Sequence, residues 1–199
     1  MAITDIETLE AIYGVAVPLA LTKVQSLITP CYHRWIETSR FVVLSTVGPE
    51  GTDASPRGDI GPVVRVDGPK RLLLPDWMGN NRIDSLRNIV RDPRVSLMFM
   101  VPGSKNVVRV NGLGAVLADE DVRDTFEKGG KRPRTVIEVT VQEAYFQCAK
   151  ALMRSELWSG KDLSKTVPSA GDFVKEINED FDGAAYDSGY TEYAKPKMW

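Results

Sequence analysis

The stretch between Phe41 and Val141 is a succession of short apolar runs separated by Gly- and Pro-containing turns, and this pattern restricts the fold more than any other feature. Runs such as Phe41–Val47 and Thr135–Val141 are rich in β-branched residues and have the length of β-strands. Turns such as Gly48–Gly51 connect them without a regular series of intervening helices. We therefore expect a mainly β fold, an antiparallel barrel of about six strands with flanking α-helices.

The bulk composition is that of an ordinary globular chain. Its 199 residues fit one domain with appended segments, and a net charge of -2 gives no general attraction to nucleic acid or to an anionic membrane. No apolar run approaches the ~20 residues that span a bilayer, and the acidic N-terminus is unlike a secretory signal. Cys31 and Cys148 form no C-x-x-C motif. We expect a cytoplasmic protein that binds neither nucleic acid nor membrane.

The single histidine, His33, limits the chemistry of the chain. It excludes a His-rich metal centre within one chain, and any Ser-His-Asp or Cys-His arrangement would have to use it. His33 falls in a predicted amphipathic helix that begins with Thr29 as N-cap and Pro30 at the first position. We assign His33 no chemistry and expect no metal site.

The segment Leu72–Leu86 has the layout of an anion-binding site. A short apolar run ends at Pro75, a polar turn follows, and a helix is predicted to begin with Asn80 or Asn81 as its N-cap. The free N–H groups and the positive dipole end of such a helix favour a phosphate, and Arg82 can add a charge-assisted contact. The alternative is a well-capped surface helix whose Arg82 is simply solvated.

Further polar positions interrupt the apolar strands. Arginine is costly to bury unpaired, so Arg57 and Arg109 each reach solvent or meet an anion or a carboxylate. Arg57 could pair with Asp59 across a bend, and Arg109 could face outward from the barrel. Trp77 and Trp158 flank polar positions, where an aromatic ring can stack on a planar ligand. The set lacks a base–nucleophile pair, which favours chemistry carried by a cofactor.

Taken together, these segments resemble the pyridoxamine 5'-phosphate oxidase-like family of FMN-binding split barrels. Between Phe41 and Trp158 the family's segments occur in its order and spacing: PRGD, LLLPDWMGNNRIDSLRNI, DPRVSLMFMVPG, VVRVNG and CAKALMRSELW. Jointly they are far more specific than any one of them. The resemblance implies a six-stranded antiparallel split β-barrel with flanking α-helices, and a homodimer with FMN at the subunit interface.

The resemblance also implies a set of cofactor contacts. The PRGD and PDW segments line the flavin and its ribityl chain, and the turn that ends at Arg82 holds the phosphate. Arg109 lies in a strand facing the cofactor, whereas Ser155 and Trp158 reach the site from the second subunit. The implied FMN-binding residues are Arg57, Gly58, Asp59, Pro75, Asp76, Trp77, Asn80, Asn81, Arg82, Arg109, Ser155 and Trp158.

The sequence departs from the true oxidases at several positions. Asn80-Asn81 replaces a more basic phosphate turn, Val107 stands where a glutamine is usual, and Pro62 lies near the place of an expected lysine. The Arg-x-His substrate motif is missing, because no histidine follows His33. These departures argue against pyridoxamine phosphate as the substrate.

We therefore expect an N-terminal helical segment that packs on the barrel (1–40), an FMN-binding split barrel (41–158), and a C-terminal helix and tail at the dimer interface or pocket rim (159–199). The expected function is an FMN-dependent oxidoreductase that transfers hydride or electrons between FMN and a small organic substrate or NAD(P)H. One alternative is a non-catalytic binder or sensor of flavin, or of a related deazaflavin or tetrapyrrole, on the same barrel. Another is a plain interaction domain.

Overall fold

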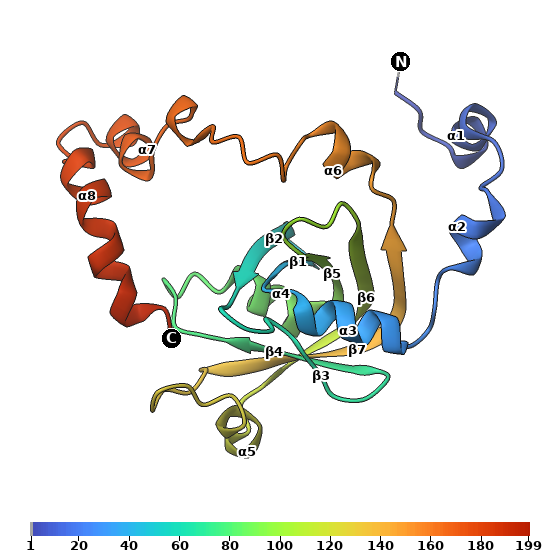
Figure 1. Ribbon diagram of the computed structural model, residues 1–199, viewed down its shortest axis with the longest axis horizontal. Helices are drawn as coiled ribbons and strands as arrows, with labels where there is room; N and C mark the ends of the chain where they lie inside the picture. Colours follow the sequence, from blue (N-terminus) through green and yellow to red (C-terminus); the bar gives the residue numbers. More distant parts are fainter. Residues whose placement is uncertain (1) are drawn as a thin grey trace.

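The computed structural model describes residues 2–199 and contains one antiparallel sheet with the strand order β2-β1-β5-β6-β7-β4-β3 (Figure 1). The prediction of six strands was wrong by one, because a two-residue strand, β3, pairs with the edge of β4. The closure of the sheet into a barrel stays a prediction. The strands are β1 (Phe41–Gly48), β2 (Gly51–Gly58), β3 (Arg65–Val66), β4 (Arg71–Asp76), β5 (Arg94–Met100), β6 (Val107–Leu117) and β7 (Thr135–Gln147).

Helical residues are about as numerous as strand residues, so the fold is mixed α and β rather than mainly β. Helix α3 begins at Pro30 with Thr29 as its N-cap residue, as the sequence predicts. The α-helices are α1 (Ile6–Tyr13), α2 (Pro18–Thr22), α3 (Pro30–Thr38), α4 (Asp84–Arg91), α5 (Glu120–Asp124), α6 (Lys150–Arg154), α7 (Ala170–Ile177) and α8 (Gly183–Ala194), and the 3₁₀ turns are η1 (Ser164–Thr166) and η2 (Lys195–Lys197).

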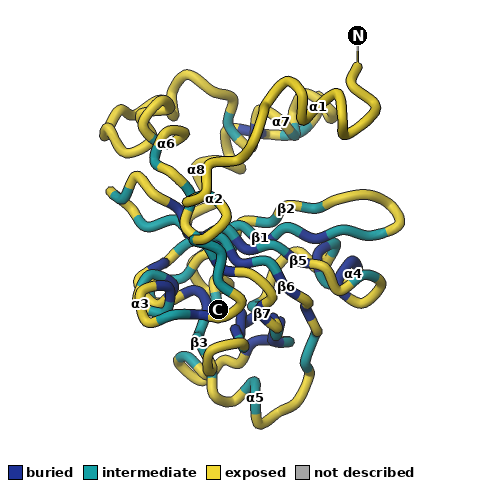
Figure 2. The backbone as a smooth tube through the Cα atoms, turned by 90° about the vertical axis from the view of Figure 1, so that its right-hand side faces the viewer, coloured by how far each residue is buried: buried dark blue, intermediate teal, exposed yellow. Residues whose placement is uncertain are grey.

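The hydrophobic core lies between the curved sheet and helices α3 and α4 (Figure 2). Strands β1 and β5 bury every second residue, as the alternation of apolar residues in a half-buried strand requires. Leu44 and Phe99 from these strands and Ile36 from α3 are completely buried. Each such side chain contributes about 1.5–3 kcal/mol relative to its exposed state. This core holds β4 and β7 in fixed positions, and β2 is held by its pairing with β1.

Helix α4 is joined to the sheet by polar contacts as well as by Ile89. Its Asn88 side-chain Nδ2 donates a hydrogen bond to Thr46 Oγ1 on β1 at 3.1 Å. Asn88 approaches the backbone of Gly48 so closely that a Cβ added there would lie 2.2 Å from Asn88 Oδ1. A side chain at position 48 would displace Asn88, and the close approach places α4 beside β1 and β2.

Two terminal segments extend away from the sheet. The N-terminal arm (residues 2–22) carries α1 and α2, which bury no residue, and the C-terminal arm (residues 150–199) carries α6, α7 and α8. Both arms are coloured almost entirely as exposed in Figure 2. The sequence did not predict α8 as a helix. None of the described helices is both long enough and apolar enough to cross a membrane.

Candidate functional site

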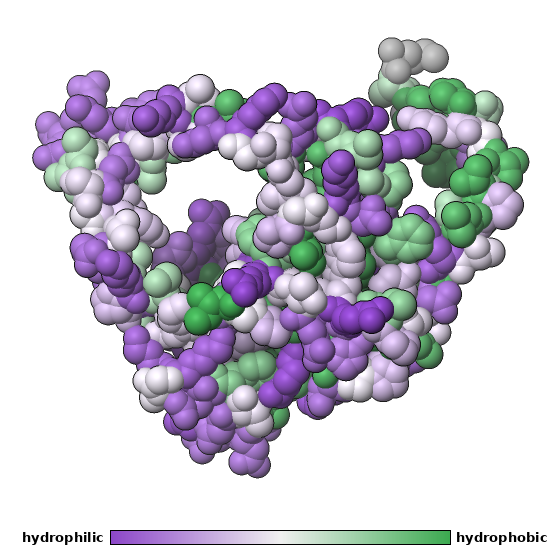
Figure 3. Space-filling view, in the orientation of Figure 1, coloured by the Kyte–Doolittle hydropathy of each residue, from purple (hydrophilic) through white to green (hydrophobic). Residues whose placement is uncertain are grey.

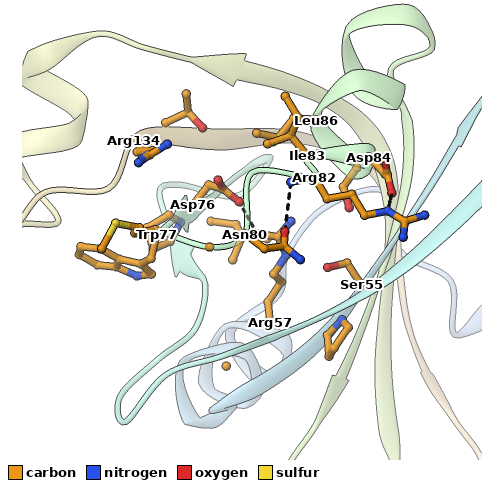
Figure 4. Close-up of a pocket in the computed structure, with 18 of the residues that line it drawn as sticks. Ser55, Arg57, Asp76, Trp77, Asn80, Arg82, Ile83, Asp84, Leu86 and Arg134 are labelled. Atoms are coloured by element: carbon orange, nitrogen blue, oxygen red, sulfur yellow. Dashed lines mark hydrogen bonds and ion pairs between the residues drawn. The ribbon is translucent and has the colours of Figure 1, made fainter. Parts of the chain in front are cut away.

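A cavity of about 680 Å³ opens where three segments of the chain meet (Figure 4). The segments are the end of β2, the stretch from the end of β4 to the first turn of α4, and the start of β7. Since β4 and β7 are neighbours, Asp76 lies opposite Thr135, and Arg57 of β2 reaches Asp76 to form an ion pair. This ion pair links β2, at one edge of the sheet, to the end of β4 at the cavity. The volume is in the range of small-molecule and cofactor sites.

Most of the residues that the sequence predicts as ligand contacts line this one cavity. They come from two stretches about 20 residues apart, and the fold brings them to the same side of the sheet. The predicted residues in the cavity wall are Arg57, Gly58, Asp59, Pro75, Asp76, Trp77, Asn80, Asn81 and Arg82.

Three predicted contacts do not line the cavity within one chain. Arg109 lies on β6 with its guanidinium 5.4 Å from the centre of the Tyr145 ring. Ser155 follows α6, where its Oγ donates to Leu152 O, and Trp158 Nε1 donates to Ser104 O at 2.7 Å. The expectation that Ser155 and Trp158 act from a second subunit stays a prediction, as does the role of Arg109.

The carboxylates of the cavity wall are engaged by neighbouring donors. Asp76 pairs with Arg57, and the buried carboxylate of Asp59 accepts from Lys128 Nζ at 2.5 Å. The suggested Arg57–Asp59 pair across a bend therefore does not form. Arg82 Nε donates to Asp84 Oδ2 at 2.5 Å. Because these acids are already paired, they repel an incoming anion less than free carboxylates would.

The turn before α4 is built by local backbone chemistry. Asn80 Oδ1 accepts from Arg82 N at 3.0 Å, a hydrogen bond typical of an Asx turn. Asn81 and Ile83 both have left-handed backbone angles, with φ of 63° and 53°. The N-cap of α4 is Ile83, without a side-chain cap, so the prediction of Asn80 or Asn81 at this position was wrong.

This arrangement turns the start of α4 towards the cavity. Asp84, Ser85 and Leu86, which form the first turn, line its wall, and the N–H groups of a first helical turn have no partner within the helix. Ile83 is β-branched and therefore strained in the left-handed region, and strain of this kind is concentrated at functional sites. The helix end thus presents uncapped donors to the cavity.

Several buried polar atoms in the cavity wall have no hydrogen-bond partner among the residues that the structure describes. They are Arg57 Nε, Trp77 Nε1 and Thr135 Oγ1. A buried polar group left unpaired costs about 1–3 kcal/mol, and such atoms are uncommon in native proteins. Three residues of the cavity wall thus carry buried polar atoms whose hydrogen-bonding capacity is unused.

Sequence reasoning missed the contribution of β7 and of the C-terminus. Arg134 lies beside the turn, where its Nη1 donates to Asn81 Oδ1 at 2.8 Å, and Thr135 follows it in the cavity wall. Met198 lines the cavity from the end of the chain. Only the pairing of β4 with β7, across some 60 residues of sequence, could have revealed Arg134, and the sequence carries no local signal of that pairing.

Comparison with known proteins identifies a family and several similar solved structures. The family described as pyridoxamine 5'-phosphate oxidase matches residues 28–148. No curated protein matches the sequence significantly. The family match covers more than half of the chain. It extends over α3, the whole sheet and all of the cavity wall except Met198.

Among solved structures, similarity extends to HupZ of Group A Streptococcus (17% identity, TM-score 0.48, 59% of this chain and 91% of that chain). A candidate pyridoxamine 5'-phosphate oxidase of Lactobacillus delbrueckii is 20% identical (TM-score 0.49, 61% and 95%). A nimC/nimA family protein of Clostridium acetobutylicum is 16% identical (TM-score 0.44, 59% and 86%). By its family match, the chain belongs to the pyridoxamine 5'-phosphate oxidase-like family.

Proposed function

We propose that the protein is an FMN-binding flavoprotein that acts as an oxidoreductase. The observation that carries this proposal is the gathering of the family's predicted contacts in one cavity that also holds unpartnered buried polar atoms. Family membership adds to it, because the matched region contains almost the whole cavity. We further propose that the sheet serves as the split barrel of this family.

The residues of the cavity fit the two ends of FMN. The dianionic phosphate suits the uncapped first turn of α4, together with Asn80, Asn81 and Arg82. The planar ring system has carbonyl oxygens and ring nitrogens as acceptors, which suit Arg57 Nε and Trp77 Nε1. When bound, FMN supplies a ring system that accepts or delivers a hydride or electrons.

The protein's part in the reaction is to bind and orient FMN and to keep water out of the cavity. Arg57 and Asp76 are mostly buried, with side chains 21% and 13% exposed, so their ion pair holds the cavity wall in one geometry. Trp77 gives the same wall an apolar surface that excludes water. Hydride transfer to or from a flavin needs no acid or base from the chain itself. The reacting partner in this proposal is a small organic substrate or NAD(P)H.

The absorbance spectrum of the purified protein, before and after adding FMN and then NADPH, tests this function. We expect a yellow protein with bands of oxidised flavin that bleach on reduction by NADPH or by a small organic donor. Flavin that binds but that no such donor reduces would identify a non-catalytic binder instead. A protein that stays colourless in excess FMN would contradict both.

We also propose that two copies of the chain form the functional unit. The chain exposes 13358 Å², whereas a compact monomer of 22.0 kDa exposes about 9,300 Å². The excess is about 4,000 Å² per chain, or about 8,000 Å² for two chains, which is more than the roughly 2,000–5,000 Å² in total that obligate dimers bury. It arises from the two arms, which carry most of the exposed large apolar side chains.

The shape of the molecule supports a second copy as the partner. Figure 3 shows an opening between the C-terminal arm and the body of the sheet, and apolar residues of the N-terminal arm gathered on the opposite side. Exposed apolar patches of this extent are rare on monomers. In the proposed dimer each chain covers the arms of the other, and Ser155 and Trp158 belong to the partner's site.

A further inference from the structure

We propose that the last five residues, Lys195–Trp199, form a movable wall of the cavity that controls access to the cofactor. The wall is supplied by the same chain that supplies the rest of the cavity. This inference rests on the proposed function, since the molecule behind the wall is taken to be FMN. It assigns a role to a segment that lies outside the family match, which ends at residue 148.

The position of Met198 is the first observation. Among the described residues that line the cavity, Met198 alone comes from beyond residue 135. In Figure 1 the C-terminal arm arches away from the end of β7 and returns, so that the chain ends close to β4. The arm therefore brings the last residues back to the cavity over a long path.

A single hydrogen bond between the segment and the neighbouring loop is the second observation. Lys131 Nζ, in the hairpin between α5 and β7, donates to Pro196 O at 2.6 Å. The hairpin leads directly into Arg134, which lines the cavity. One exposed contact of this kind is weak enough to break and re-form readily, which is what a movable wall requires.

The side chain of Met198 is suited to this role. It remains 51% exposed although it lines the cavity, so it is not packed rigidly in place. An unbranched thioether adapts its shape to a neighbouring surface better than a branched side chain does. Met198 can therefore close against a bound ring and withdraw from it.

The segment is presented by a rigid helical hairpin, α7–α8. Gly171 and Gly183 are in close contact: a Cβ added to Gly171 would lie 2.3 Å from Gly183 O. Gly171 N also donates to Asp187 Oδ1 at 2.9 Å. At the far end of α8, Lys197 Nζ lies 3.3 Å from the centre of the Tyr193 ring and joins η2 to the helix. These contacts hold α7, α8 and η2 together, so the last residues move with the hairpin.

The first experiment measures how fast FMN leaves the protein. We compare the full chain with a chain that lacks residues 195–199 and with the Lys131→Met variant, following flavin fluorescence after dilution. We expect about tenfold faster release from the truncated chain and an intermediate rate from Lys131→Met, because changes within one site act mainly on the dissociation rate. Equal release rates for the three proteins would overturn the proposed wall.

The second experiment uses the cofactor-free protein and a matched pair of glycines. Gly171→Ala cannot keep the α7–α8 contact, whereas Gly189→Ala, in α8, adds a Cβ with no atom within 4 Å. We expect backbone amides of residues 77–86 to exchange with deuterium about threefold faster in Gly171→Ala than in Gly189→Ala, because the wall no longer shields them. Identical exchange in both variants would contradict the proposal.

The two experiments separate this inference from the proposed function. Failure of the full chain to bind FMN would overturn the flavin assignment, and the exchange experiment would still decide whether the last residues cover the cavity. Tight FMN binding with no effect of the truncation on release or of Gly171→Ala on exchange would overturn the wall and leave the flavin assignment intact.

Discussion

Arg82 marks the boundary between the cavity and solvent. Its side chain is 80% exposed, and only its Nε is engaged, by Asp84. The other donors of the guanidinium are free to contact an anion at the start of α4. The phosphate assignment therefore depends on this residue and can be tested there.

Replacement of Arg82 by alanine should weaken FMN binding by about 1–3 kcal/mol, which is the range for losing a hydrogen bond to a charged group. Fluorescence titration with FMN measures the change. Arg94→Ala is the matched control, because Arg94 also pairs with a nearby aspartate but lies outside the cavity. Equal affinity of the Arg82→Ala protein and the unaltered chain would refute the assignment.

At the scale of single residues, the sequence indicates which buried polar side chains need a partner but not which residue that partner is. Arg57 was identified because an arginine within an apolar strand needs a partner. Its partner, Asp76, lies on another strand, and Asp59 pairs with Lys128 from a distant hairpin. Such partners depend on how β2, β4 and β7 are arranged in space, and local sequence does not contain that information.

At the scale of an element, helix α4 also shows what local sequence predicts and what it does not. The asparagine-rich turn predicts a helix start correctly to within a few residues, because Asn side chains compete well for backbone N–H groups. Asn80 forms its hydrogen bond to Arg82 N instead of capping the helix, which delays the first turn to Asp84. The sequence did not predict helix α8, which buries only Gly183 and whose one row of large side chains at helical spacing consists of Tyr186, Tyr190 and Tyr193.

The strain at Ile83 gives a prediction about α4. Ile83→Asn should raise the free energy of unfolding by about 1 kcal/mol, since a left-handed backbone costs about that much for most residues and asparagine tolerates it. Denaturant unfolding measures the difference. Val90→Asn, at an exposed position in the body of α4, should change stability little. Loss of stability in Ile83→Asn would show that the side chain of Ile83 outweighs its backbone strain.

At the scale of the whole molecule, the arms account for the surplus surface. If two chains cover one another's arms, sedimentation should give a species of about 44 kDa, twice the 22.0 kDa of the chain. Removal of residues 2–22 should shift the equilibrium towards the single chain, because α1 and α2 bury nothing within it. The Val90→Asn variant should keep the mass of the unaltered protein. A monomer at every concentration of the full chain would contradict the proposed dimer.

Trp158 tests whether the two chains share a site. It lies outside the cavity of its own chain, so in the proposed dimer its effect on FMN comes from the partner's side. Trp158→Ala should weaken FMN binding and reduce the quenching of flavin fluorescence, because an indole ring stacks on planar ligands. Leu163→Ala, at an exposed position on the same arm but outside α7 and α8, controls for a general loss of contacts between the arms. Unchanged affinity and quenching would remove Trp158 from the site.

The position of Met198 in the cavity wall has a practical consequence for purification. Because Met198 lines the cavity and Lys131 binds the carbonyl of Pro196, an affinity tag fused after Trp199 would begin at the rim of the cavity. If the proposed wall retains FMN, protein prepared in that way would release it during washing and would be mistaken for a colourless protein. A tag fused ahead of the N-terminal arm starts on the far side of the molecule. The colour of the purified protein then reports whether flavin was bound in the cell.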